Sequence, residues 1–445
     1  MFCLVALTVS RFHQHFGFLR PFRPLLVLTL LAAIYAYLNP RYLASGSLLR
    51  TWPAKFLAGL GIAACASVPF GISIGGSGRF ILEQYSKTLI LAFLVIAAVR
   101  TVRDLYTMLW AFVIGCGFMA YLSVFVFRMS RASADGLLRI ASGYSYDAND
   151  LATVAVVGLP LVVLAYQSVG GKQRMVAGLV MIGLGITLAK SGSRGGFLGL
   201  LAFLSGMLAV VPAMHLGRKL AFLAVTCAAL AIAAPQGYWD QMRTLLHPKQ
   251  DYNWDAQSGR RKVFLRGLGY FARNPITGIG VDNFARAEGT ISDIAQAQAL
   301  DPSLPGIKWS VAHNSFLEAM AEMGVPGLVL FGGLVVGGVV KTRQLRRRLP
   351  ASWIRGDSEE RFLYLMSLYL PVAWLTFMVS GFFVSFTYYD LPYILGALTA
   401  GLYASVDEKL HRGSSAAPPS SGFPVPTPRY RGGLPPAGVA LRFRP

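Results

Sequence analysis

The sequence has little charge and few cysteines. Of its 445 residues only 14% are charged, whereas 54% are hydrophobic, and its mean hydropathy is +0.52. A soluble domain carries about 25% charged residues, so this composition excludes an ordinary soluble enzyme. The four cysteines (Cys3, Cys65, Cys116 and Cys227) all lie in apolar segments, and no two form a Cys-x-x-Cys pair. They therefore predict packing positions, with neither disulfides nor a zinc site.

Acidic residues and metal-binding patterns are also scarce. The 41 basic residues outnumber the 20 acidic ones, which gives a net charge of +21. In a soluble protein this excess would suggest nucleic acid, but basic residues also collect in the cytoplasmic loops of membrane proteins. We therefore expect no nucleic-acid partner. Because the predicted outer face has neither a His/Glu pair at helical spacing nor an Asp-x-Asp motif, we expect neither a metal nor a cofactor.

Long apolar segments make up most of the chain. Runs of about 16–24 residues match the thickness of a bilayer and predict an all-α, polytopic bundle of about 12 transmembrane helices. The predicted spans are 24–39, 52–70, 82–99, 104–127, 149–168, 174–190, 194–213, 217–234, 315–340, 361–384 and 388–405. The first ten residues precede Arg11 and no small-residue cleavage site follows, so we interpret them as a compact first span.

The charge pattern divides the chain into four parts. Residues 1–234 hold the first spans, 235–312 form a large polar loop with helices, 313–405 hold the last three spans, and 406–445 form a basic, disordered cytoplasmic tail. The basic cluster from Lys341 to Arg348 predicts the cytoplasmic side. The large loop then lies on the opposite, periplasmic face. A connection of this length exceeds what joining two helices requires, so we expect the functional site there.

Basic residues that violate this charge bias are the first candidates for a site. Arg194 follows Ser193 at the predicted outer end of a span, where it could bind an anionic group of a lipid-linked substrate or simply cap a helix or pair with an acid. In the large loop, residues 258–273 predict an amphipathic helix with Ser258 as its N-cap. Its stripe of Arg260, Phe264 and Phe271 could bind a substrate or merely lie on the lipid surface.

His313 stands where the chain re-enters the membrane. An imidazole titrates near neutral pH and could accept a proton from an attacking hydroxyl, although it could also be a structural interface residue. Two nearby segments have further possible roles. The segment from Tyr146 to Asp150 could cap the fifth span or bind a sugar, and residues 277–284 form a glycine turn without the context of a nucleotide fingerprint.

Four motifs, in this order, resemble the bacterial O-antigen ligase/polymerase superfamily. They are Ser193-Arg194-Gly-Gly, the run from Gly259-Arg260 to Phe264, Asn274-Pro-x2-Gly-x-Gly-x2-Asn283-Phe284, and His313-Asn314-x9-Gly324-x2-Gly327. The resemblance implies inverting, metal-independent glycosyl transfer from undecaprenyl diphosphate at the periplasmic face of the inner membrane. By motif, Arg194 and Arg260 would bind the diphosphate and His313 would activate the acceptor hydroxyl. Position 264 is Phe where relatives often carry Trp.

The resemblance leaves several choices open. We predict His313 as the base, donor-diphosphate binding by Arg194, Arg260, Arg261, Arg243 and Arg266, and supporting roles for Asn314, Ser193 and Asn283. The expected partners are a lipid-linked glycan donor, a lipid A-core or other glycan acceptor, and membrane lipids. Ligation to lipid A-core is preferred on the spacing after His313. The alternatives are an O-antigen or exopolysaccharide polymerase, a protein O-oligosaccharyltransferase or, in a different class, a transporter of lipid-linked glycans.

Overall fold

Helices dominate the part of the chain that the structure describes. The computed structural model describes residues 1–39, 51–132, 137–141, 146–210, 230–250, 256–304, 306 and 308–415, together with 217, 224 and 226. Met1–Val406 form one compact unit and Asp407–Pro445 a second. One antiparallel hairpin, β1 (Met129–Ala132) with β2 (Leu137–Ile140), interrupts the helices. The sequence analysis did not predict this hairpin.

The helices follow one another with short connections, except around the large loop. The first half contains α1 (Phe2–Ser10), α2 (Phe12–His15), η1 (Gly17–Leu19), α3 (Pro24–Leu38), α5 (Trp52–Ser67), η2 (Val68–Phe70), α6 (Ile74–Phe80), η3 (Ile81–Tyr85), α7 (Ser86–Ala98), α8 (Val102–Tyr121), η4 (Leu122–Val126), α9 (Ala148–Ser168), α10 (Gly171–Ser191) and α11 (Arg194–Val210). The second half contains α13 (Tyr238–Arg243), η5 (Pro248–Gln250), α14 (Arg260–Arg273), α15 (Phe284–Thr290), α16 (Asp293–Leu300), α17 (Ser315–Arg346), η6 (Ala351–Arg355), α18 (Ser358–Ser380), η7 (Gly381–Phe383) and α19 (Asp390–Ser415).

Eight described segments are long and apolar enough to cross a membrane, which confirms the all-α, polytopic class. They are Gly17–Leu38, Trp52–Phe70, Ile74–Ala98, Val102–Val126, Ala148–Ser168, Gly171–Ser191, Ser315–Arg346 and Ser358–Phe383. The total of about 12 helices stays a prediction, because most of the span predicted at 217–234 lies outside the described residues. Most of the tail predicted at 406–445 also lies outside them. The expected compact first span has the predicted bounds, since α1 (Phe2–Ser10) ends directly before Arg11. Its nine helical residues reach only about 14 Å, so its role as a span stays a prediction.

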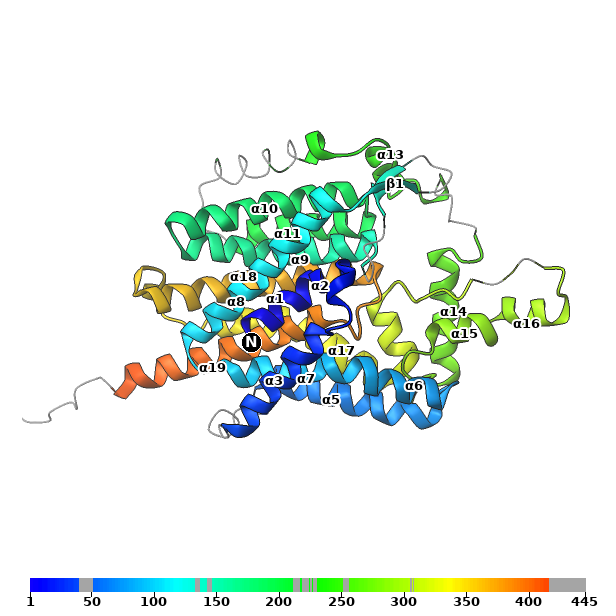
Figure 1. Cartoon of the computed structure of the whole chain (residues 1–445), viewed down its shortest axis with the longest axis horizontal. Coiled ribbons are helices and arrows are strands. Elements are labelled where there is room, and N and C mark those ends of the chain that lie inside the picture. The colour runs from blue at the N-terminus through cyan, green and yellow to red at the C-terminus, as the bar shows by residue number, and fades with distance from the viewer. Residues whose placement is uncertain are drawn as a thin grey trace, which may run out of the picture. The chain divides into compact units, whose positions relative to one another are not determined.

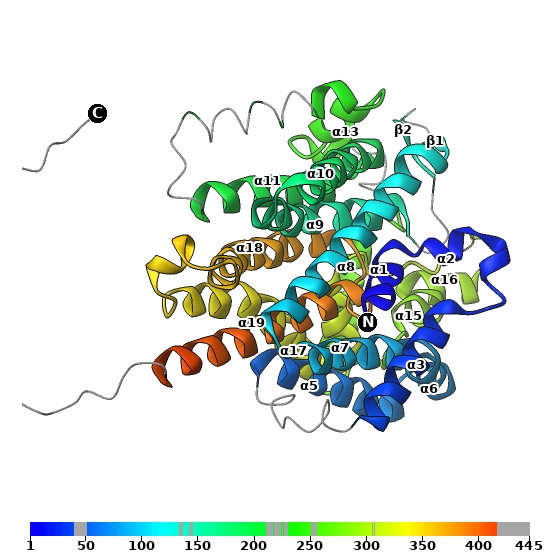
Figure 2. The same cartoon turned by 60° about the vertical axis from the view of Figure 1, so that its left-hand side comes forward.

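The centre of the helical unit is formed by α9 and α18. Figure 2 shows α9 surrounded by neighbours, and it packs against α8, α10, α11 and α18. In the most apolar 18-residue stretch of α9, 89% of the residues are buried, whereas in that of α10 only 39% are buried. In α17, Gly338 lies so close to the Trp374 ring of α18 that a Cβ atom there would collide with it. This close approach fixes α17 against the central helices.

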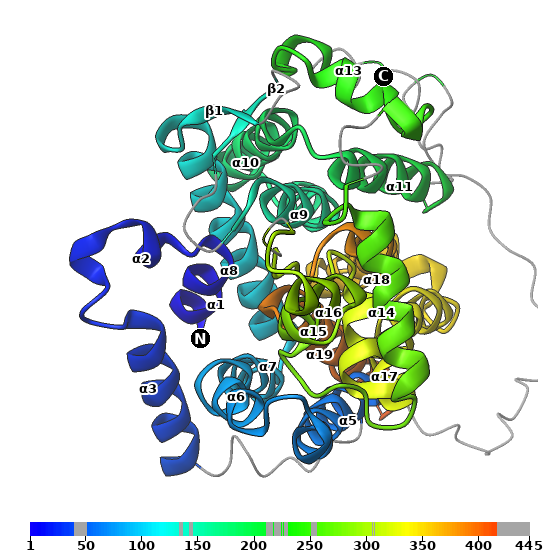
Figure 3. The same cartoon turned by 90° about the vertical axis from the view of Figure 1, so that its right-hand side faces the viewer.

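The large loop folds onto the start of α17. Figures 1 and 3 show α14, α15 and α16 gathered at one end of the long helices. One hydrophobic cluster joins Val263 and Tyr270 of α14 to Phe284 of α15 and to Leu317 and Ala321 of α17. Burial of these side chains stabilises the loop against the first turns of α17. The large loop is therefore folded and packed against the start of α17, next to the residues that were expected to form the site.

Candidate active site

His313 is held in an unusual backbone conformation immediately before α17. Its φ of 49° lies in the left-handed region, which few non-glycine residues adopt. Two contacts fix this conformation. The backbone N–H of His313 donates to Ser385 Oγ at 2.9 Å, and Asn314 Oδ1 caps α17 by accepting from the N–H groups of Phe316 and Leu317, each at 3.0 Å. Such strain is found at functional sites when the surroundings enforce it.

The surroundings of His313 keep its imidazole neutral. The pKa of His313 is lowered to about 4, mainly by burial and then by the positive charges of Arg260 and Lys308, while the charge of Asp147 opposes them. Charges from three parts of the chain therefore act on this histidine: the start of α14, the segment before α17 and the cap of α9. A neutral imidazole can accept a proton at pH 7. Lys308 had no assigned role in the sequence analysis, because nothing in its local sequence marks it.

The acidic segment before α9 is a helix cap. Asp147 Oδ1 accepts from the N–H groups of Asn149 at 2.6 Å and Asp150 at 2.8 Å. The Asp150 carboxylate accepts in return from the Asp147 N–H at 3.1 Å, which completes a capping box. Of the two roles that the sequence left open for this segment, the structure shows the cap. The cap also fixes Asp147 near His313.

The amphipathic helix α14 starts one residue later than expected. Its N-cap is Gly259, not Ser258 as predicted, and no side chain caps it. Arg260 is half-buried, and its positive charge lowers the pKa of His313. Arg261 is exposed. Phe264 is 40% exposed. The sequence left open which of these two arginines faces the donor, and the position of Arg260 makes it the better candidate.

Arg266 is engaged inside the protein. Its Nε donates to Glu288 Oε1 at 2.8 Å, and a second ion-pair contact joins Arg266 Nη2 to Glu288 Oε2. Tyr270 Oη donates to the same Oε1 at 2.8 Å. The Glu288 side chain is only 1% exposed. These hydrogen bonds raise the pKa of Arg266. The guanidinium joins α14 to α15, which is not the placement expected of a group that binds a donor diphosphate.

Arg194 and Arg243 occupy different environments near one another in the fold. Ser193 Oγ accepts from the Gly196 N–H at 3.2 Å, so Ser193 caps α11. Arg194 Nη1 donates to Thr244 Oγ1 at 2.8 Å and joins α11 to the segment after α13. Arg243 forms a surface ion pair with Asp240 at 3.0 Å, in which the side chains are 74% and 78% exposed. Surface pairs of this kind contribute little to stability.

Arg194 lies at the same end of the bundle as His313. The start of α11 packs against η7, where Gly195 touches the Phe383 side chain. Two residues beyond Phe383, Ser385 accepts the hydrogen bond from His313. The short segment from Phe383 to Ser385 thus connects the surroundings of Arg194 with those of His313.

The predicted glycine turn is confirmed and is organised by a buried glutamate. Gly278, Gly280 and Asp282 have φ values of 69°, 87° and 59°. Asn283 Nδ2 donates to Ser77 Oγ at 2.9 Å and to the Ile279 carbonyl at 3.0 Å, so this predicted supporting residue links α6 to the turn. Among the residues that the structure describes, no group of three or more His, Cys, Asp or Glu is placed to hold a metal ion.

Glu322 accepts three hydrogen bonds in this region. Its carboxylate accepts from the N–H groups of Asp282 and Phe284, each at 2.8 Å, and from Tyr388 Oη at 2.7 Å. One turn earlier, Glu318 accepts from the Thr387 N–H at 3.1 Å. The sequence analysis assigned no role to either. The sequence feature that could have marked them is a pair of acidic residues four positions apart, which lie on one face of an otherwise apolar helix.

We expect Glu322→Ala to destabilise the protein strongly. The substitution leaves one buried donor and two partly buried donors without an acceptor, and a buried donor left unpaired costs about 1–3 kcal/mol. Thermal unfolding of the purified protein should show a midpoint well below that of the wild type. Asp293→Ala, which removes an exposed acid from α16, is the matched control and should unfold close to wild type. Equal midpoints for the two variants would contradict this role of Glu322.

The family comparison covers the segment that holds these residues. Residues 177–332 match the family described as O-Antigen ligase. The match contains Arg194, Arg260 and His313, and it begins within α10 and ends within α17. No curated protein matches the chain. The chain's resemblance to the O-antigen ligase/polymerase superfamily is therefore confirmed over residues 177–332.

Proposed function

We propose that the protein is an inverting glycosyltransferase that moves a glycan from undecaprenyl diphosphate to lipid A-core oligosaccharide. The reaction would take place at the periplasmic face of the inner membrane, with the C-terminus in the cytoplasm. The observation that best supports this proposal is the placement of His313. It combines a constrained backbone, a pKa lowered to about 4 and the nearby charge of Arg260. A neutral base beside a fixed cation suits attack on a sugar that is leaving from a phosphate.

In the proposed step, the acceptor hydroxyl oxygen forms a bond to the anomeric carbon of the donor. The bond from that carbon to the diphosphate oxygen breaks, and the diphosphate leaves with the electron pair. The proton of the acceptor hydroxyl passes to the imidazole of His313. Attack opposite to the leaving group inverts the configuration at the anomeric carbon. All atoms are accounted for by donor, acceptor and the histidine.

The arginines would supply the charge that stabilises the departing diphosphate. A guanidinium forms two parallel hydrogen bonds to phosphate, which gives both charge and orientation. The charge of Arg260 acts on His313, and Arg194 lies at the same end of the bundle, so we assign these two to the diphosphate. The exposed Arg261 and Arg243 are assigned to the outer part of the donor. Arg266 is assigned to holding α14, because Glu288 occupies its guanidinium.

An in vitro transfer assay tests the function. Purified protein is incubated with a lipid-linked oligosaccharide and rough lipopolysaccharide, and the products are separated on a gel. A shift of the lipopolysaccharide band supports the ligase. Lengthening of the lipid-linked donor would instead show a polymerase. Transfer to a Ser or Thr of an added protein would show a protein O-oligosaccharyltransferase, and an intact donor moved across proteoliposomes would show a transporter.

The pH dependence of transfer follows from the neutral state of His313. A base must be unprotonated, so activity is present above its pKa and is lost as the pH falls through that value. With the pKa of His313 at about 4, kcat/KM should stay flat from pH 8 to about 5.5 and then fall. Arg260→Gln removes a nearby cation and should move this fall to higher pH. A wild-type fall centred near the ordinary histidine pKa of about 6.5 would contradict the lowered value.

A further inference from the structure

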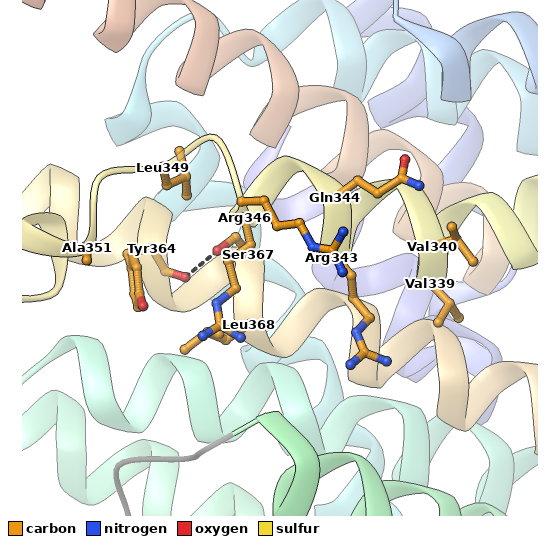
Figure 4. A pocket seen from close by; sticks show the side chains of 11 residues that line it. Val339, Val340, Arg343, Gln344, Arg346, Leu349, Ala351, Tyr364, Ser367 and Leu368 are labelled. Atoms are coloured by element: carbon orange, nitrogen blue, oxygen red, sulfur yellow. Dashed lines mark hydrogen bonds between the residues drawn. The ribbon is translucent and has the colours of Figure 1, made fainter.

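A cavity lies at the end of α17 remote from His313. Its volume is about 720 Å³, and it is bounded by the last turns of α17, the turn before η6 and the middle of α18. Figure 4 shows Arg343 and Arg346 on α17 beside Tyr364 and Ser367 on α18. The volume lies within the range of pockets that bind small ligands. Nothing in the proposed glycan transfer uses this cavity.

The chemistry of the walls is both cationic and apolar. Arg343, Arg346 and Arg347 line the cavity, and no acidic residue is among the described residues that line it. The Arg346 guanidinium carbon lies 5.9 Å from the centre of the Tyr364 ring. Val340, Leu349 and Leu368 supply apolar wall. A ligand complementary to these walls carries negative charge at one end and hydrocarbon at the other.

The cavity continues a lipid-facing stripe along α17. Val325, Val329, Val336 and Val340 are 45–59% exposed, and their spacing places them on one face of the helix. After the break at Gly324, the 22 residues from Val325 to Arg346 span roughly 33 Å, close to the thickness of a bilayer core of about 30 Å. The arginines therefore lie at the level of lipid headgroups when the valines contact acyl chains.

We propose that this cavity binds the headgroup of an anionic glycerophospholipid, with its acyl chain along the valine stripe. The forked guanidinium groups would contact the phosphate oxygens, and the apolar wall would contact the glycerol and the upper chain. A basic cluster also sets membrane orientation, but orientation alone does not require three arginines, a tyrosine and apolar side chains to enclose one cavity. Arg343 is roughly 27 Å along the helix beyond the break at Gly324, so the diphosphate of the donor cannot fill both sites.

Lipid binding by the full-length protein tests this proposal. The purified protein is titrated with phosphatidylglycerol or phosphatidylethanolamine, and bound lipids are counted by native mass spectrometry. We expect wild type to favour phosphatidylglycerol and the triple variant Arg343→Gln/Arg346→Gln/Arg347→Gln to lose at least about ten-fold in affinity for it. The control Arg103→Gln/Arg348→Gln/Arg355→Gln removes the same charge from exposed positions that do not line the cavity. It should bind within about two-fold of wild type.

Three results would overturn the proposal. Equal losses in the two triple variants would show a general effect of surface charge. Equal binding of the two lipids by wild type would show that the cavity does not select an anionic headgroup. Inorganic phosphate that displaces bound phosphatidylglycerol at a similar concentration would assign the cavity to a soluble anion. Thermal unfolding in lipid-free detergent must be similar for both triple variants, so that a loss of binding is not a loss of fold.

Discussion

Replacing His313 is expected to lower glycan transfer by about 10²- to 10⁴-fold, the usual contribution of a general base. His313→Ala removes the imidazole, but it also places alanine at a φ of 49°, which costs roughly 1–2 kcal/mol. His313→Asn is the sharper variant, because asparagine tolerates the left-handed region and cannot act as the base. Both variants should insert into the membrane and bind the lipid-linked donor. The measurement is the rate of lipopolysaccharide modification at saturating donor.

A purely structural role of His313 makes a different prediction. In that case His313→Asn would retain transfer, because the Ser385 contact uses only the backbone N–H. His313→Gly provides a second check, since glycine adopts the same φ without strain. Loss of transfer in both His313→Asn and His313→Gly, with unchanged thermal unfolding and donor binding, would separate catalysis from folding. Wild-type rates in either variant would remove His313 from the mechanism.

Much of the fold could be predicted from hydropathy because the bilayer imposes a single length scale on apolar helices. That scale identified segments such as Ala148–Ser168 and Ser358–Phe383. The end of the first segment before Arg11 was also visible, because the apolar run stops there. Hydropathy did not reveal the β1–β2 hairpin, whose four-residue strands carry little pattern. Short elements held by tertiary contacts are the ones that periodicity cannot find.

The residues of the candidate site could likewise be predicted only in part. Motif order marked His313, Arg194 and Arg260, and charge on the outer face marked Arg266 as well. The motif could not show that Glu288 occupies the Arg266 guanidinium, because the two residues are 22 positions apart and meet only when α14 and α15 pack. Glu322 was missed because its donors come from two segments far from it in the sequence, the turn at 277–284 and the segment that holds Tyr388. Local sequence indicates which residues are unusual, whereas their partners are decided by packing.

Arg194→Lys is expected to reduce transfer by about 10²- to 10³-fold, a typical effect of removing one group that stabilises developing charge. Lysine keeps the positive charge, but its single ammonium cannot form the two parallel hydrogen bonds that a guanidinium makes to phosphate. The loss should appear in kcat more than in KM, since charge on the diphosphate grows as the glycosidic bond breaks. Steady-state kinetics with the lipid-linked donor would measure this division.

Two controls separate a role in transfer from a role in holding the fold. Thr244→Val removes the partner that accepts the 2.8 Å hydrogen bond from Arg194 and leaves the guanidinium in place, so it should reduce transfer far less than Arg194→Lys. Arg273→Lys makes the same exchange at an exposed position in the last turn of α14 and should leave the rate unchanged. If Arg194→Lys turned over like wild type, the diphosphate role of Arg194 would be refuted. If Thr244→Val were as defective as Arg194→Lys, the contact between α11 and the segment after α13 would be what transfer requires.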